Sequence, residues 1–152
     1  MIPRRTSTQE EKMFKKILVG YDGSDGAKKA LRAAVDLAKH YRSELYSISV
    51  EEDLPHYAAT VGEVLEAKAE KNGYFARLIE EAKELAAKEG VILHAEVVAG
   101  HEVRTIVDYA KEKHFDLMVI GFMGHSRIYD RVWGSTSQNI TRLVPCTVMA
   151  VK

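Results

Sequence analysis

Three glycines near the C-terminal end of the chain have a spacing that suits phosphate binding. Gly121, Gly124 and Gly134 precede Ser135 and Thr136 in the pattern G-x2-G-x9-G-[ST]. Glycine lets a backbone approach phosphate oxygens because it has no Cβ, and a helix that begins after Gly134 offers N–H groups to an anion. The same residues can also simply form a turn and start a helix, so the pattern alone leaves polyphosphate binding open.

Other motifs that carry chemistry are missing from the sequence. It contains neither a G-x4-G-K-[ST] loop nor a G-x-G-x-x-G pattern, which argues against an ordinary P-loop hydrolase and against an NAD site. No serine lies in a nucleophile elbow, and Cys146, which follows Pro145, is predicted to be a packing residue. The histidines have no metal-ligand spacing. We therefore predict no catalytic and no metal-ligating residue, although His125 and Asp130 are candidates for a base near a bound phosphate.

The elements that must position the glycines alternate along the chain. Short apolar or alternating runs predict strands at 17–19, 45–50, 91–98, 117–120 and 147–151. Apolar residues at helical spacing predict helices that begin after Ser24, after Thr60, at about 102 and at 135, and that end near 41, 90, 113 and 143. Gly73 weakens the second helix at its middle, whereas His94 and Glu96 suggest that the third strand lies at an edge.

This alternation predicts an α/β fold. Right-handed crossovers between successive strands give a doubly wound, five-stranded parallel sheet with helices on both faces. Ligands of such sheets bind at the carboxyl ends of the strands, beside the point where the winding reverses. The turns after the first and fourth strands both lie at that edge, which strengthens the interpretation of the glycines as a phosphate loop.

Length and composition narrow the class of protein further. The chain has 152 residues, enough for one domain, and its 22 basic and 22 acidic side chains cancel. We therefore expect no nucleic-acid partner. The start of the chain lacks an apolar segment of the kind that a signal peptide or membrane helix needs. With a single cysteine, these features predict a cytoplasmic protein without a disulfide framework and without a membrane partner.

Two parts of the sequence together resemble the universal stress protein family. They are the glycine pattern and the segment KILVGYDGS at 16–24, and the resemblance covers about residues 14–152. It implies the adenine nucleotide alpha-hydrolase-like fold with strand order 3-2-1-4-5. The start of the chain has turn formers and mixed charge but no periodicity, which predicts a flexible tail at 1–13. The resemblance also implies a homodimer formed through the C-terminal strand at 146–152. An edge shielded by the N-terminal tail is the alternative.

The glycine pattern is the mark of the members of that family that bind ATP. The resemblance implies that Asp22 meets the adenosine, Val50 the adenine, and Gly121, Gly124 and Gly134 the ribose and phosphates. An Asx turn at Asp22, a helix cap at Ser24 and a core role for Val50 are the alternatives. The implied binding residues are Gly20, Tyr21, Asp22, Ser24, Val50, Ile120, Gly121, Gly124, His125, Ser126, Gly134, Ser135 and Thr136.

Two positions depart from the family pattern. Met123 stands where a polar or basic residue is frequent, and Thr147 stands where the family usually has proline. Neither change removes a required glycine. We therefore expect an ATP-binding, dimeric regulatory module that carries Mg²⁺ or Mn²⁺ held mainly by the phosphates. A slow ATPase or a phosphoryl or nucleotidyl transfer enzyme is the alternative, and a structural dimer without nucleotide is a third.

Overall fold

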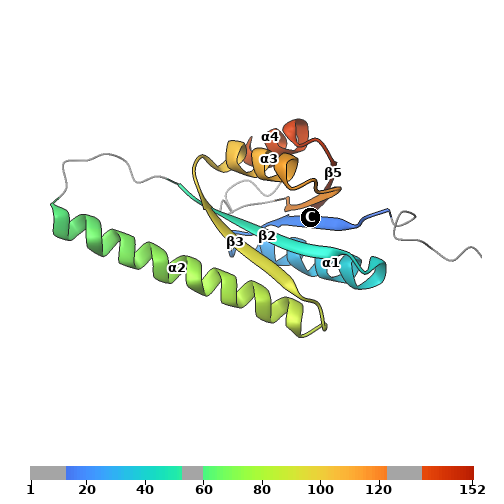
Figure 1. Ribbon diagram of the computed structural model, residues 1–152, viewed down its shortest axis with the longest axis horizontal. Helices are drawn as coiled ribbons and strands as arrows, with labels where there is room; N and C mark the ends of the chain where they lie inside the picture. The colour runs from blue at the N-terminus through green and yellow to red at the C-terminus, as the bar shows by residue number, and fades with distance from the viewer. Residues whose placement is uncertain (1–12, 53–59, 123–134) are drawn as a thin grey trace, which may run out of the picture.

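One parallel sheet with helices on both faces organises the protein. The computed structural model describes residues 13–52, 60–122 and 135–152. In these ranges the elements are β1 (Lys16–Gly20), α1 (Asp25–Tyr41), β2 (Glu44–Glu51), α2 (Val61–Ala87), β3 (Leu93–Ala99), α3 (Glu102–Glu112), β4 (Leu117–Gly121), α4 (Ser135–Leu143) and β5 (Thr147–Val151). The strand order is β3-β2-β1-β4-β5, which confirms the predicted doubly wound fold. Figure 1 shows α1 and α2 on one face of the sheet and α3 and α4 on the other.

The central strands explain why the sheet is doubly covered. Ile17, Leu18 and Val19 of β1 are all fully buried, although neighbouring side chains of a strand point to opposite faces. Such a strand needs helices on both sides, and parallel strands of this kind read as continuous apolar runs. Ile17 and Val19 accordingly pack with α1 and α2, whereas Leu18 packs with the side of α3 and α4.

The third strand begins later than its apolar pattern suggested. The prediction began it at Val91, but β3 starts at Leu93 and Ile92 is exposed. The end of α2 causes the difference, because the amide of Val91 still donates to the carbonyl of Ala86 and Gly90 adopts a φ of +73°. Gly73, in contrast, does not interrupt α2, so the penalty of one helical glycine is outweighed there.

The two edges of the sheet are β3 and β5. His94 and Glu96 of β3 are exposed, as expected for an edge strand. β5 pairs with β4 alone among the described residues, and its side chains from Val148 to Val151 are half-buried. Residues 1–12 of the predicted tail lie outside the described residues, and Met13 is exposed. None of the described helices is long and apolar enough to span a membrane.

The order of the strands places the turns after β1 and β4 side by side. Ile17, Leu18 and Val19 of β1 pair with Leu117, Met118 and Val119 of β4. β2 lies on the other side of β1, so the winding reverses between β1 and β4. The turns that follow these two strands therefore meet at the edge where doubly wound folds bind ligands.

Candidate functional site

A cavity of about 590 Å³ lies at the carboxyl ends of β1, β2 and β4. Its volume is in the range of small-molecule and cofactor sites. The ends of the three strands supply its floor, and the first residues of α1, α3 and α4 lie around it. Its described lining consists of Gly20, Tyr21, Asp22, Ser24, Ala27, Ile48, Ser49, Val50, Glu52, Lys71, Tyr74, Phe75, Leu78, Glu102, Ile106, Ile120, Gly121, Ser135, Thr136, Ser137 and Ile140.

Every predicted site residue that the structure describes lines this cavity. They come from the ends of three strands and the start of α4, which are distant in sequence: Gly20, Tyr21, Asp22, Ser24, Val50, Ile120, Gly121, Ser135 and Thr136. The remaining predicted residues, Gly124, His125, Ser126 and Gly134, lie outside the described residues. The fold therefore brings together the described part of the predicted site.

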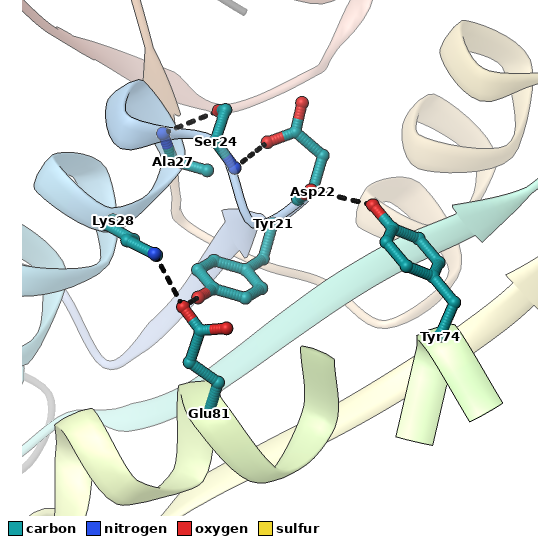
Figure 2. A network of polar contacts seen from close by, with 7 residues as sticks. All are labelled: Tyr21, Asp22, Ser24, Ala27, Lys28, Tyr74 and Glu81. Atoms are coloured by element: carbon teal, nitrogen blue, oxygen red, sulfur yellow. Dashed lines mark hydrogen bonds and ion pairs between the residues drawn. The ribbon is translucent and has the colours of Figure 1, made fainter. Parts of the chain in front are cut away.

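The turn after β1 is ordered by its own side chains. Asp22 Oδ1 accepts a hydrogen bond of 2.9 Å from the amide of Ser24, and Ser24 Oγ accepts one of 3.1 Å from the amide of Ala27 (Figure 2). Asp22 thus forms an Asx turn and Ser24 caps α1, the two structural alternatives that the sequence left open. These contacts fix the carboxylate of Asp22 at the cavity wall.

Tyr21 is held through its hydroxyl, its amide and its carbonyl. The residue is 3% exposed and its hydroxyl donates to Glu81 Oε1 of α2 at 2.9 Å, while Glu81 forms an ion pair of 3.0 Å with Lys28 of α1. Its amide donates to the carbonyl of Ile48, and its carbonyl accepts from the hydroxyl of Ser49 at 2.7 Å. Burial and the hydrogen bond to Glu81 raise the pKa of Tyr21, so the phenol stays neutral.

Gly121 is a glycine for a reason that the sequence did not reveal. A Cβ at this position would lie 2.6 Å from the carbonyl carbon and 2.8 Å from the carbonyl oxygen of Gly26. Those are backbone atoms of α1, which cannot turn aside as a side chain can. Close packing of β4 against the first turn of α1 therefore requires glycine here, whether or not a phosphate approaches. A Cβ at Gly20, by comparison, would meet only side-chain atoms, Met118 Cε at 3.4 Å and Ile120 Cγ2 at 3.9 Å.

One wall of the cavity comes from α2 and was not predicted. Lys71 Nζ donates to the carbonyl of Glu52 at 2.7 Å, and the hydroxyl of Tyr74 donates to the carbonyl of Asp22 at 3.1 Å. The helical period alone could have placed Lys71, Tyr74 and Leu78 on one face of α2, because residues three, four and seven positions apart share a helix face. The sequence does not say that this face looks onto the turn after β1.

The described lining carries an uneven charge. Its charged side chains are the carboxylates of Asp22, Glu52 and Glu102 and the ammonium of Lys71. A polyphosphate beside three carboxylates is repelled unless cations offset the charge. The start of α4 is the better place for it, because Ser135, Thr136 and Ser137 line the cavity where the helix dipole favours anions.

Known proteins resemble the chain over nearly its whole length. A model described as "Universal stress protein family" matches residues 13–152. The universal stress protein YxiE of Bacillus subtilis is 33% identical over 148 residues, which cover 92% of this chain and 100% of that relative. The universal stress protein UspA from Lactobacillus plantarum has a similar structure, with a TM-score of 0.79 and 28% identity over 91% of this chain and 98% of that chain.

Among the similar structures is one solved with a bound nucleotide. It is a universal stress protein solved in complex with cAMP, which is 26% identical to this chain with a TM-score of 0.73. The match covers 92% of this chain and 98% of that chain.

Proposed function

The chain belongs to the universal stress protein family, and we propose that the cavity at the carboxyl ends of its strands binds ATP. The observation that supports this most is the convergence of residues from four separate segments, at 20–24, 50, 120–121 and 135–136, on one cavity of about 590 Å³. The similar protein that was solved with cAMP supports an adenine nucleotide as the ligand class. The complete glycine pattern favours a polyphosphate over a monophosphate.

The lining suggests how the ligand lies. Ile48, Val50 and Ile120 offer apolar surface to the base, and the carboxylate of Asp22 can accept hydrogen bonds from the ribose hydroxyls. The phosphates then point to Ser135 and Thr136, toward the positive end of the α4 dipole. Gly124, His125, Ser126 and Gly134 belong to the same proposed phosphate site. Mg²⁺ or Mn²⁺ bound to the phosphates would reduce the repulsion from the carboxylates.

We propose a regulatory binding module rather than a dedicated enzyme. No group of three or more His, Cys, Asp or Glu side chains in the described parts of the chain is arranged to hold a metal ion. The side chains of Asp22, Ser24 and Tyr21 make hydrogen bonds that order the turn after β1. An ordered turn of this kind suits a site that binds a nucleotide and whose occupancy regulates the protein.

Calorimetry with the purified protein tests the assignment. We expect ATP with Mg²⁺ to bind, and an Asp22→Ala variant to bind about 10- to 100-fold more weakly because hydrogen bonds to a charged acceptor are lost. Asp36→Ala, which removes an exposed carboxylate from α1, is the matched control and should bind as the wild type does. Absence of binding at millimolar ATP would refute the proposal, and tighter binding of cAMP would change the ligand.

The same preparations decide whether the bound nucleotide is hydrolysed. Slow hydrolysis or transfer at this site requires phosphate release that falls in parallel with ATP affinity in Asp22→Ala. Release that persists unchanged in that variant comes from a contaminant. Gly121 should not be substituted for this purpose, because a larger residue there collides with the backbone of Gly26.

We further propose that two copies of the chain pair through β5. This strand has one neighbour among the described strands, and its apolar side chains are only half-buried. An apolar edge with unpaired backbone groups favours association. Light scattering after gel filtration should give twice the chain mass of 17.0 kDa. A monomer at micromolar concentrations would contradict this assembly.

A further inference from the structure

One face of α2 holds the turn that carries Asp22. Tyr74, Leu78 and Glu81 lie four and three residues apart, so they form a single stripe along the helix. The hydroxyl of Tyr74 donates to the carbonyl of Asp22 at 3.1 Å, and Glu81 accepts from the hydroxyl of Tyr21 at 2.9 Å (Figure 2). The two ends of the stripe therefore contact two neighbouring residues, Asp22 and Tyr21.

The middle contact of the stripe is a packing contact. Gly23 has a φ of +78°, and a Cβ there would lie 2.6 Å from Leu78 Cδ2. Leu78 thus fills the space directly over Gly23. A shift of α2 away from the sheet would break the contacts to residues 21, 22 and 23 together, because all three come from one rigid helix face.

The other side of the turn is tied to the sheet and to α1. Tyr21 is bonded to Ile48 and Ser49 of β2 through its backbone, and Glu81 links the same tyrosine to Lys28 of α1. α2 contacts the carbonyl of Asp22 through the hydroxyl of Tyr74. The docked position of α2 therefore contributes to the orientation of the peptide after Asp22, together with the hydrogen bond from the amide of Ser24 to Asp22 Oδ1 within the turn.

We infer that Tyr74 and Glu81 are positioning residues which orient Asp22 for the nucleotide, so that docking of α2 and occupancy of the cavity are thermodynamically linked. This inference rests on the proposed nucleotide site. If the state with α2 undocked does not bind nucleotide, the ligand stabilises the docked state by the factor 1 + [ligand]/Kd. Binding of the nucleotide then changes how firmly α2 is docked, and the first turns of that helix are exposed to solvent.

Hydrogen exchange measures this linkage directly. In the wild type, a concentration of ATP 100 times its Kd should slow exchange of the amides around Tyr74 and Leu78 by up to about 100-fold. Amides in the last turn of α1, near Tyr41 on the opposite edge of the sheet, should not change. Unchanged exchange in α2 while calorimetry shows bound ATP would overturn the inference and leave the proposed function standing.

A matched pair of hydroxyl deletions tests positioning in the free protein. Tyr74→Phe should speed exchange of the α2 amides and of the Ser24 amide by about five-fold, the size expected for one lost hydrogen bond. Tyr41→Phe makes the same change far from the cavity and should leave both regions as they are. Equal exchange in the two variants would refute the positioning role, and this arm holds even if no nucleotide binds.

A second pair at Glu81 separates the hydrogen bond from the charge. Glu81→Gln retains an acceptor for the hydroxyl of Tyr21, so slow exchange at Ser24 should be largely kept. Glu81→Ala removes the acceptor and should speed exchange there by about five-fold. If the alanine variant exchanges as slowly as the glutamine variant, Glu81 does not position the turn.

Discussion

The two halves of α2 have similar hydrophobic spacing and opposite environments. In residues 73–87, Leu78, Ala82 and Ala86 are buried against the sheet. In residues 61–72, Val61 and Leu65 are 78% and 62% exposed. Figure 1 shows why: the start of α2 extends past the carboxyl ends of the strands, so no sheet lies beneath it. Periodicity thus predicts a helix, whereas burial depends on what the helix passes over.

Deleting one leucine from each half should show the largest difference. Leu78→Ala should lower the free energy of unfolding by about 2–4 kcal/mol, because it removes a buried side chain and leaves a cavity. Leu65→Ala should change it by less than about 0.5 kcal/mol, since the side chain is exposed and the helix propensities are similar. Urea denaturation measures both. Comparable losses would mean that residues 61–72 are packed.

Removing the N-terminal caps of α1 and α2 should also lower stability unequally, by a smaller difference than the two leucine variants show. Ser24→Ala deletes the cap of the packed helix α1 and should cost about 1 kcal/mol in global stability. Thr60→Ala deletes one half of the capping box of α2, whose first turns are exposed. There we expect fraying, seen as a loss of helical circular dichroism, with a change of only about 0.3 kcal/mol in unfolding. Equal costs would mean that the first turns of α2 are packed as well as those of α1.

The smallest effect is a pH dependence confined to the packed half. The ion pair with Lys28 holds the pKa of Glu81 below its usual value near 4.5. A carboxyl with a lowered folded pKa adds stability above its unfolded pKa, and loses it as the pH falls through the folded pKa. The stability gap between wild type and Glu81→Gln should therefore shrink below about pH 4.5.

The control for that titration lies in the exposed half of the same helix. Glu66→Gln, which removes an exposed carboxylate in residues 61–72, is the matched control variant. Even the gap at Glu81 should be only a few tenths of a kcal/mol, since that side chain is 40% exposed and water screens the pair. A larger gap at Glu66 than at Glu81 would contradict the assignment of charges to the two halves.

Local sequence patterns predicted which helices and strands form, but they predicted the first and last residues of these elements less accurately. The apolar run at 17–19, the capping box at Thr60 and Glu63 and the alternation at 45–50 identify elements by local physics, and the structure contains all of them. The start of β3 was misplaced because Val91 is apolar yet bonded to the last turn of α2. Apolar character does not distinguish a strand from the residues that close a helix.

The candidate site was predictable only in part. The glycine pattern and the segment at 16–24 pointed to Asp22, Gly121 and Ser135, and these residues do line one cavity. The wall from α2 was missed, as was the collision with Gly26 that makes glycine necessary at position 121. Both depend on contacts between residues distant in the chain, and no local pattern encodes the distance between two backbones.

The amino-acid sequence by itself determined the alternating elements, the family and the types of residue at the strand ends, because propensity, periodicity and capping act over a few neighbouring residues. Only the tertiary structure decided which face of α2 meets the turn after β1, which half of α2 is buried and which glycine is required by packing. Those outcomes depend on how the helices cross the sheet, and that geometry is set by the close packing of the whole core.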